Sequence, residues 1–141
     1  MSIGESIAAW LKGYDGGFEL TDQISTDRLE ATPEAYGIFK APGDETRRFV
    51  DGSRDATVHY LFIARQPAQT DRMRIGNHEW LEGLERWIRE QTMRRALPDL
   101  GAGRTCFAIT VADSYAAEEQ SDAEITYQIS VAVEYFEEAR T

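Results

Sequence analysis

The first stretch of the chain spaces its apolar residues every three or four positions. These residues are Ile3, Ile7, Trp10 and Leu11. That spacing places them on one face of a helix, which we expect to end near Gly13. Ser2 and Glu5 stand three positions apart at its start, as in a capping box, where each side chain accepts a backbone N–H of the other's residue.

A longer helix is predicted from Asn77 to about Arg95. Its inner stripe is Trp80, Leu81, Leu84, Trp87, Ile88 and Gln91, and charged residues fill the other face. We expect the two tryptophans to lie in the core with Ile129 and Val131. Pro98 and Gly101 then end the helical element.

The rest of the chain alternates or is rich in strand-forming residues. Strands are predicted over 18–29, 35–41, 45–50, 54–65, 104–114 and 124–135. Asp51-Gly52-Ser53 joins two of them as a hairpin turn, and Pro42-Gly43-Asp44 closes another. The stretch 54–65 carries apolar residues on both faces, which indicates a central strand. Residues 66–71 and the acidic stretch 115–122 are expected to be loops.

This order of elements predicts one α+β domain over residues 1–141. Two helices should lie on one face of a mostly antiparallel or mixed sheet. In the last strand we expect Ile125, Tyr127, Ile129, Val131 and Val133 to face inward, and Thr126, Gln128, Ser130 and Glu134 to face outward. Residues 136–141 are expected to be a mobile tail.

The net charge of −10 is unevenly distributed along the chain. Residues 46–95 hold ten arginines against seven acids, whereas residues 113–141 hold eight acids and one arginine. Such segregation suits head-to-tail self-association, in which a basic surface of one copy meets an acidic surface of the next. Solvated faces that keep the protein in solution are an equally good explanation of the composition alone.

On the first explanation, the predicted interface lies on the hairpin turn and the acidic loop. Its residues are Arg47, Arg48, Asp51, Gly52, Ser53, Arg54, Glu118 and Glu119. Raised salt should weaken such a contact.

The residues that usually carry chemistry do not converge in this sequence. His78 and Glu79 open a helix as in zinc proteases, but Glu82 replaces the second histidine. Gly101 to Arg104 follows a helix and opens a strand, the reverse of a phosphate-binding loop. Cys106 has apolar neighbours and is expected to be a small packed side chain. We therefore predict no catalytic residue, no metal and no cofactor.

Two classes of partner are also unexpected. A strongly acidic chain is a poor ligand for nucleic acid, which selects basic surfaces. No apolar run approaches the roughly 20 residues of a membrane span, and Glu5 stands where a signal peptide would be apolar. We expect a protein made and kept inside a cell, or in something assembled there.

Four segments together resemble minor structural proteins of siphophage and prophage tails, of the tail terminator type. They are AYGIFKAP (35–42), HYLFIAR (59–65), NHEWLEGLERWI (77–88) and YQISVAVEY (127–135). The likeness spans about Trp10 to Tyr135, and its motifs are packing motifs. The resemblance implies a hexameric ring in the virion that caps the tail tube and offers a surface to the head–tail connector, after assembly in the host cytoplasm. The resemblance implies no catalytic residue in this chain.

Two alternatives to the terminator stay open at this point. A neck or minor capsid protein of the same virion is also a small acidic α/β subunit. A small hydrolase or ligand-binding domain would need converging polar groups with shifted pKa values, which the sequence does not supply.

Overall fold

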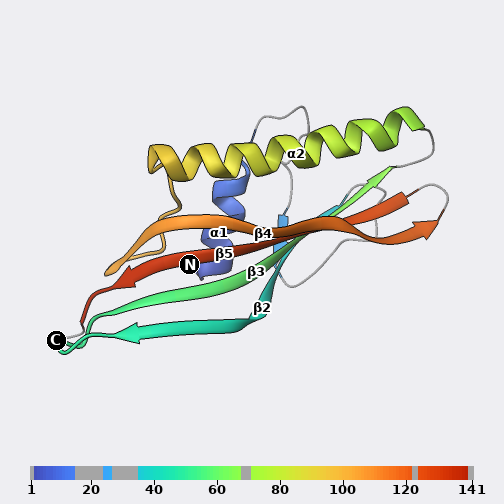
Figure 1. Cartoon of the computed structure of the whole chain (residues 1–141). Helices are drawn as coiled ribbons and strands as arrows, with labels where there is room; N and C mark the ends of the chain where they lie inside the picture. The colour runs from blue at the N-terminus through green and yellow to red at the C-terminus, as the bar shows by residue number, and fades with distance from the viewer. Residues whose placement is uncertain (1, 15–23, 27–34, 68–70, 122–123, 140–141) are drawn as a thin grey trace.

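The computed structural model describes residues 2–14, 24–26, 35–67, 71–121 and 124–139. In these residues the elements follow in the order α1 (Ile3–Leu11), β1 (Ile24–Thr26), β2 (Ala35–Arg48), β3 (Arg54–Pro67), α2 (Asp71–Arg94), β4 (Arg104–Ser121) and β5 (Glu124–Glu137). The strands lie side by side along the length of the molecule, and α2 runs lengthwise above them (Figure 1).

The sheet has the strand order β1-β2-β3-β5-β4. The short β1 pairs with β2 in parallel, and the four long strands are antiparallel. β3 lies in the middle and pairs with β5 without a break from Arg54↔Glu137 to Pro67↔Glu124. The predicted α+β class, with both helices on one face of the sheet, is therefore confirmed.

One sheet face and the two helices enclose the core. Because side chains alternate across a strand, β3 and β5 point every second residue at the helices. These are Ala56, Val58, Tyr60, Phe62 and Ala64 on β3 and Tyr127, Ile129, Val131, Val133 and Tyr135 on β5, all buried. Trp80, Leu84 and Ile88 of α2 and Ile7 and Leu11 of α1 meet them. The described inward residues of the last strand thus lie where the alternation predicts.

Helix α1 begins with the predicted capping box. The Ser2 Oγ accepts the N–H of Glu5 at 3.2 Å, and a carboxylate oxygen of Glu5 accepts the N–H of Ser2 at 3.4 Å. These bonds satisfy two backbone donors that have no partner inside the helix.

Trp87 is less buried than predicted. It is only partly buried, with its ring 4.8 Å from that of Trp10 and 5.9 Å from that of Tyr14. Trp80, two turns earlier on the same face of the helix, is the tryptophan that packs on the sheet, 6.4 Å from Phe62. Trp87 therefore packs with Trp10 and Tyr14, whereas Trp80 packs with residues of the sheet.

Two predicted breaks in the strands are wrong. Residues 42–44 do not end β2 but form a bulge in it, because Ala41 pairs with His59 and Glu45 with Thr57. β4 continues through the expected acidic loop to Ser121 and pairs with β5, with four register shifts along its length. In β2 the residues on both sides of the bulge pair with β3, and in β4 residues of the predicted loop pair with β5, so the sheet continues despite the turn-like or polar composition.

The ends of other elements also differ from the prediction. α2 begins at Asp71, six residues before the expected start at Asn77, and therefore includes Gly76. β5 extends to Glu137, so Phe136 and Glu137 belong to the sheet and not to a mobile tail. Thr126 points to the face opposite the helices yet is buried. Of the strand predicted over 18–29 only β1 is described, and the turn at 15–17 lies outside the described residues.

Candidate interaction surface

The loop that joins β2 and β3, Phe49 to Ser53, is held by its own hydrogen bonds. The Phe49 N–H donates to the Ser53 carbonyl at 2.9 Å, and the Gly52 N–H to the Phe49 carbonyl at 3.1 Å. Asp51 accepts from both the N–H and the hydroxyl of Ser53, at 2.9 and 2.5 Å. These bonds lower the pKa of Asp51, the side-chain bond from Ser53 being the largest cause. Gly52 has φ of 92°, which favours glycine.

The base of this loop is anchored to the last strand. Glu137 accepts from Arg54 Nε at 2.9 Å and from Arg104 Nε at 2.8 Å, joining β3, β5 and β4 in one row. The bond from Arg104, followed by that from Arg54, holds the pKa of Glu137 below its ordinary value. The Glu138 N–H also donates to the Gly103 carbonyl at 2.8 Å. The ends of β3, β4 and β5 next to the loop are therefore held together by these bonds.

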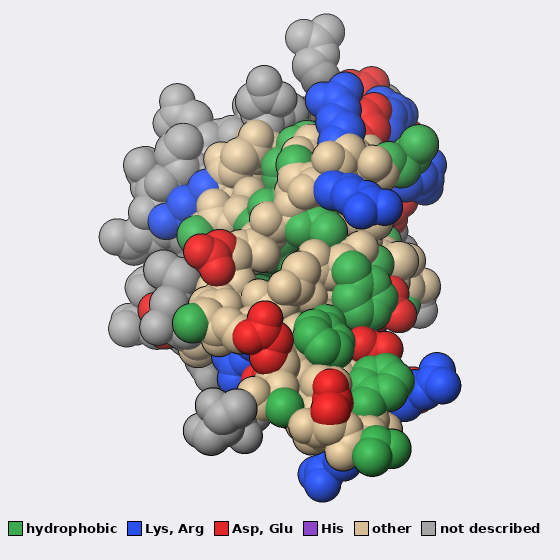
Figure 2. Space-filling model, turned by 90° about the vertical axis from the view of Figure 1, so that its left-hand side faces the viewer, with side chains coloured by type: hydrophobic (Ala, Val, Ile, Leu, Met, Phe, Trp, Pro, Cys, Tyr) green, Lys and Arg blue, Asp and Glu red, His purple; other side chains and the backbone are tan. Residues whose placement is uncertain are grey.

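Two apolar side chains project from this fixed loop. Val50 is fully exposed and Phe49 is 39% exposed, although both are large apolar residues. The guanidinium of Arg47 lies over the Phe49 ring at 5.6 Å from its centroid. Seen from the end at the left of Figure 1, apolar and acidic side chains lie next to one another over the lower half, and basic ones project at its lower and right edges (Figure 2). Phe49 and Val50 are not among the predicted interface residues, although they are an apolar pair placed directly before an Asp-Gly turn.

The structure brings six of the eight predicted interface residues together at this hairpin. Arg47, Arg48, Asp51 and Gly52 are exposed there. Ser53 is only 4% exposed and serves the turn, and the guanidinium of Arg54 is bonded to Glu137. The exposed basic groups that remain are Arg47 and Arg48.

The other two predicted residues lie at the far end of the sheet. Glu118 and Glu119 are part of β4, where Glu118 pairs with Thr126 and Thr126 with Arg65. Their side chains are outside the described residues. The predicted basic and acidic groups are thus separated along the strands and cannot meet within one copy of the sheet.

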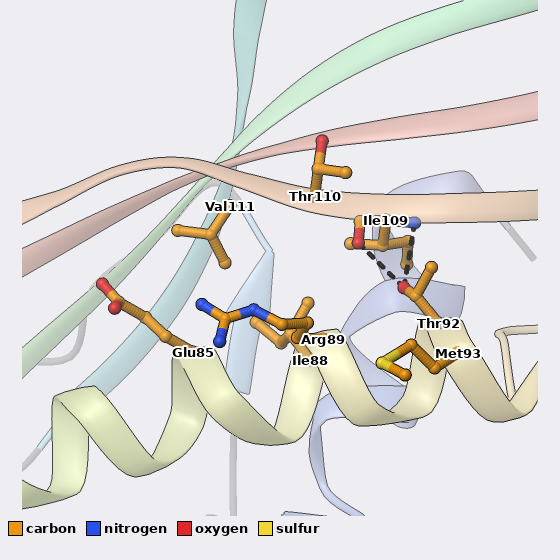
Figure 3. A pocket seen from close by; sticks show the side chains of 8 residues that line it. All are labelled: Glu85, Ile88, Arg89, Thr92, Met93, Ile109, Thr110 and Val111. Carbon is orange, nitrogen blue, oxygen red and sulfur yellow. Dashed lines mark hydrogen bonds between the residues drawn. The ribbon is translucent and has the colours of Figure 1, made fainter.

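A groove of about 270 Å³ lies between α2 and the edge strand β4. Its lining residues are Glu85, Ile88, Arg89, Thr92, Met93, Ile109, Thr110 and Val111. Figure 3 shows Val111 and Ile109 pointing toward the helix, with Met93 at one end and Glu85 at the other. Met93 is 78% exposed.

Within this groove, the side chain of Thr92 on α2 hydrogen-bonds to the backbone of β4. Its hydroxyl donates to the Ile109 carbonyl at 2.9 Å and accepts from the Ile109 N–H at 3.3 Å (Figure 3). The backbone N–H and carbonyl of Ile109, an edge-strand residue with a buried side chain, are thereby satisfied by a side chain of α2. Covering an edge in this way prevents another strand from pairing with it at that point.

The residues considered for chemistry lie apart from one another. His59 packs beside Gly43 at the bulge of β2, and the ring of His78 lies 5.9 Å from that of Tyr127. Burial raises the pKa of the Cys106 thiol to about 11, so it is protonated at neutral pH. Gly101 and Gly103 form a turn with positive φ before β4. In the described part of the chain, no three His, Cys, Asp or Glu side chains are grouped closely enough to hold a metal ion.

No helix among the described residues is long and apolar enough to cross a membrane. No protein-family profile and no curated protein sequence matches this chain.

Proposed function

We propose that this chain is a phage tail terminator, a structural subunit whose ring caps the tail tube, ends its growth and provides the head–tail joining surface. Its partners are then further copies of itself, the tail tube protein and the head–tail connector. The proposal begins from the resemblance of residues 35–42, 59–65, 77–88 and 127–135 to such proteins.

One structural observation supports a ring in particular. The subunit carries a projecting apolar loop, Phe49 to Ser53, and a separate apolar groove between α2 and β4. Contacts between two different surfaces of identical subunits are head-to-tail, and they close into a ring when the rotation between copies allows it. Each subunit of a closed ring presents one end to either side, so a ring has one face for the tube and one for the head.

Deletion of the gene from its phage tests the function directly. We expect filled heads without tails, and tails that are overlong or irregular, by electron microscopy of lysates. Complementation with the wild-type gene is the control and should restore joined particles. Purified protein should cap tubes in proportion to ring concentration, without nucleotide or metal.

A different defect would assign the chain elsewhere in the virion. Tails of normal length attached to empty heads would place the defect in DNA packaging or retention. The neck or minor capsid function would then replace the terminator.

A further inference from the structure

We infer that Val50 and Phe49 of one copy insert into the α2–β4 groove of the next copy, and that this is the contact that closes the ring. The inference rests on the proposed function and deepens it, because it names the surfaces through which the ring forms.

The loop has the properties of an inserting element. Val50 is fully exposed, so a single copy gains no burial from it. The bonds between Phe49, Asp51 and Ser53 fix its direction before any contact is made. A rigid loop loses little conformational entropy on binding, which favours affinity.

The groove is of the right size and character to receive it. An apolar cavity of about 150 Å³ holds a benzene ring, and the groove has about 270 Å³. That volume has room for the Phe49 ring together with the smaller Val50. The walls offered by Ile88, Met93 and Val111 are apolar. The guanidinium of Arg89 extends toward Glu85, away from Met93 (Figure 3).

Charge favours a second copy as the occupant of the groove. Arg47 and Arg48 are the exposed basic groups of the hairpin, since Arg54 is bonded to Glu137, whereas the whole chain has a net charge of −10. A basic loop is therefore attracted by an acidic surface such as that of another copy.

A copy cannot fill its own groove. The loop joins β2 and β3, whereas the groove borders β4, and β5 lies between β3 and β4 in the sheet. Strand pairing along β4 is an unsuitable alternative at this point, because Thr92 already bonds both backbone groups of Ile109. Side-chain insertion remains as the contact that the groove allows.

Complementary variants test this arrangement. Val50→Asp removes the inserting residue, and Met93→Lys places a charge in the apolar part of the groove, where its burial under an inserted loop is unfavourable. Both positions are exposed, so both variants should fold and unfold as the wild type does. Each should associate roughly 30-fold or more weakly than the wild type, as expected for loss of a central contact residue. Ala102→Asp and Ala102→Lys put the same charges on another exposed turn and should leave association unchanged.

Mixing the two variants gives the decisive measurement. A Val50→Asp copy keeps its groove and a Met93→Lys copy keeps its loop, so an equimolar mixture should form dimers and no rings in analytical ultracentrifugation. In a Cys106→Ser background, Val50→Cys and Met93→Cys chains should form disulfide-linked heterodimers when mixed. Val50→Cys chains that link mainly to one another would indicate a two-fold contact and overturn the inference.

The outcomes separate this contact from the function. Rings that persist with Val50→Asp would overturn the contact and leave the terminator proposal standing. Wild-type oligomers that depend on Val50 and yet cap no tubes would uphold the contact and overturn the terminator proposal. A wild-type chain that stays monomeric at high concentration would overturn both.

Discussion

Helix α2 and the Phe49–Ser53 loop distribute their apolar and polar residues in opposite ways. The helix buries Trp80, Leu84 and Ile88 and exposes charges, whereas the loop buries Ser53 and exposes Val50. Full burial of a large apolar side chain contributes about 1.5–3 kcal/mol, but a typical hydrogen bond only about 1 kcal/mol net. The helix is therefore held by the core, and the loop by a few local bonds. Val50 gains no burial in one copy, which leaves it available for a contact.

The largest effect is expected in the helix. Trp80→Ala should lower the free energy of unfolding by about 3–5 kcal/mol, because the indole is 2% exposed against Tyr36 and Phe62. Trp87→Ala is the matched variant and should cost less, about 1–3 kcal/mol, because its ring is only partly buried. Urea unfolding followed by circular dichroism measures both. Equal losses would show that Trp87 contributes as much to the core as Trp80.

A smaller loss is expected at the turn of the loop. Gly52→Ala should cost about 1–2 kcal/mol, because φ of 92° strains any residue with a Cβ. The new Cβ would also lie 3.3 Å from the Cβ of Ala139. Gly101→Ala, with φ of 104° and open space around it, separates strain from contact. Thermal unfolding that is unchanged by Gly52→Ala would mean that the loop adapts and is not rigid.

The smallest effect is expected at the anchor of the loop. Glu137→Gln should lower the free energy of unfolding by about 1 kcal/mol or less at neutral pH, since its partners are partly exposed arginines. The folded pKa of Glu137 lies below its ordinary value of 4.5, so its stabilisation is present above that pH and is lost as pH falls through the folded pKa. The difference between wild type and variant should therefore shrink below about pH 4.5. The neighbouring Glu138→Gln is the matched control for the loss of one negative charge at this end of the sheet.

Sequence spacing predicted the parts of the fold that depend on one-sided burial. The inward residues of 54–65 and 124–135 follow from alternation, and α1 follows from its capping box. The errors arose where a neighbouring strand decides the outcome. Pro42-Gly43-Asp44 has the composition of a turn, and residues 115–121 that of a loop, but β3 and β5 hold both in the sheet.

The candidate surface was predicted only in part. The arginines of the hairpin could be recognised from charge segregation, and six of the predicted residues do lie together. Charge alone could not distinguish Arg54, which bonds Glu137 from a distant part of the chain, from Arg47 and Arg48. The groove could not be predicted at all, because α2 and β4 form it only when both pack on the same core.

The sequence by itself determined the class of the fold, because the two hydrophobic periods specify which faces must be buried. It also determined the acidic character of the chain and the basic character of the hairpin. Only the tertiary structure decided which edge of the sheet α2 covers and which apolar residues stay exposed on the loop. The physical reason is that burial and backbone pairing depend on neighbours distant in sequence, which no local pattern specifies.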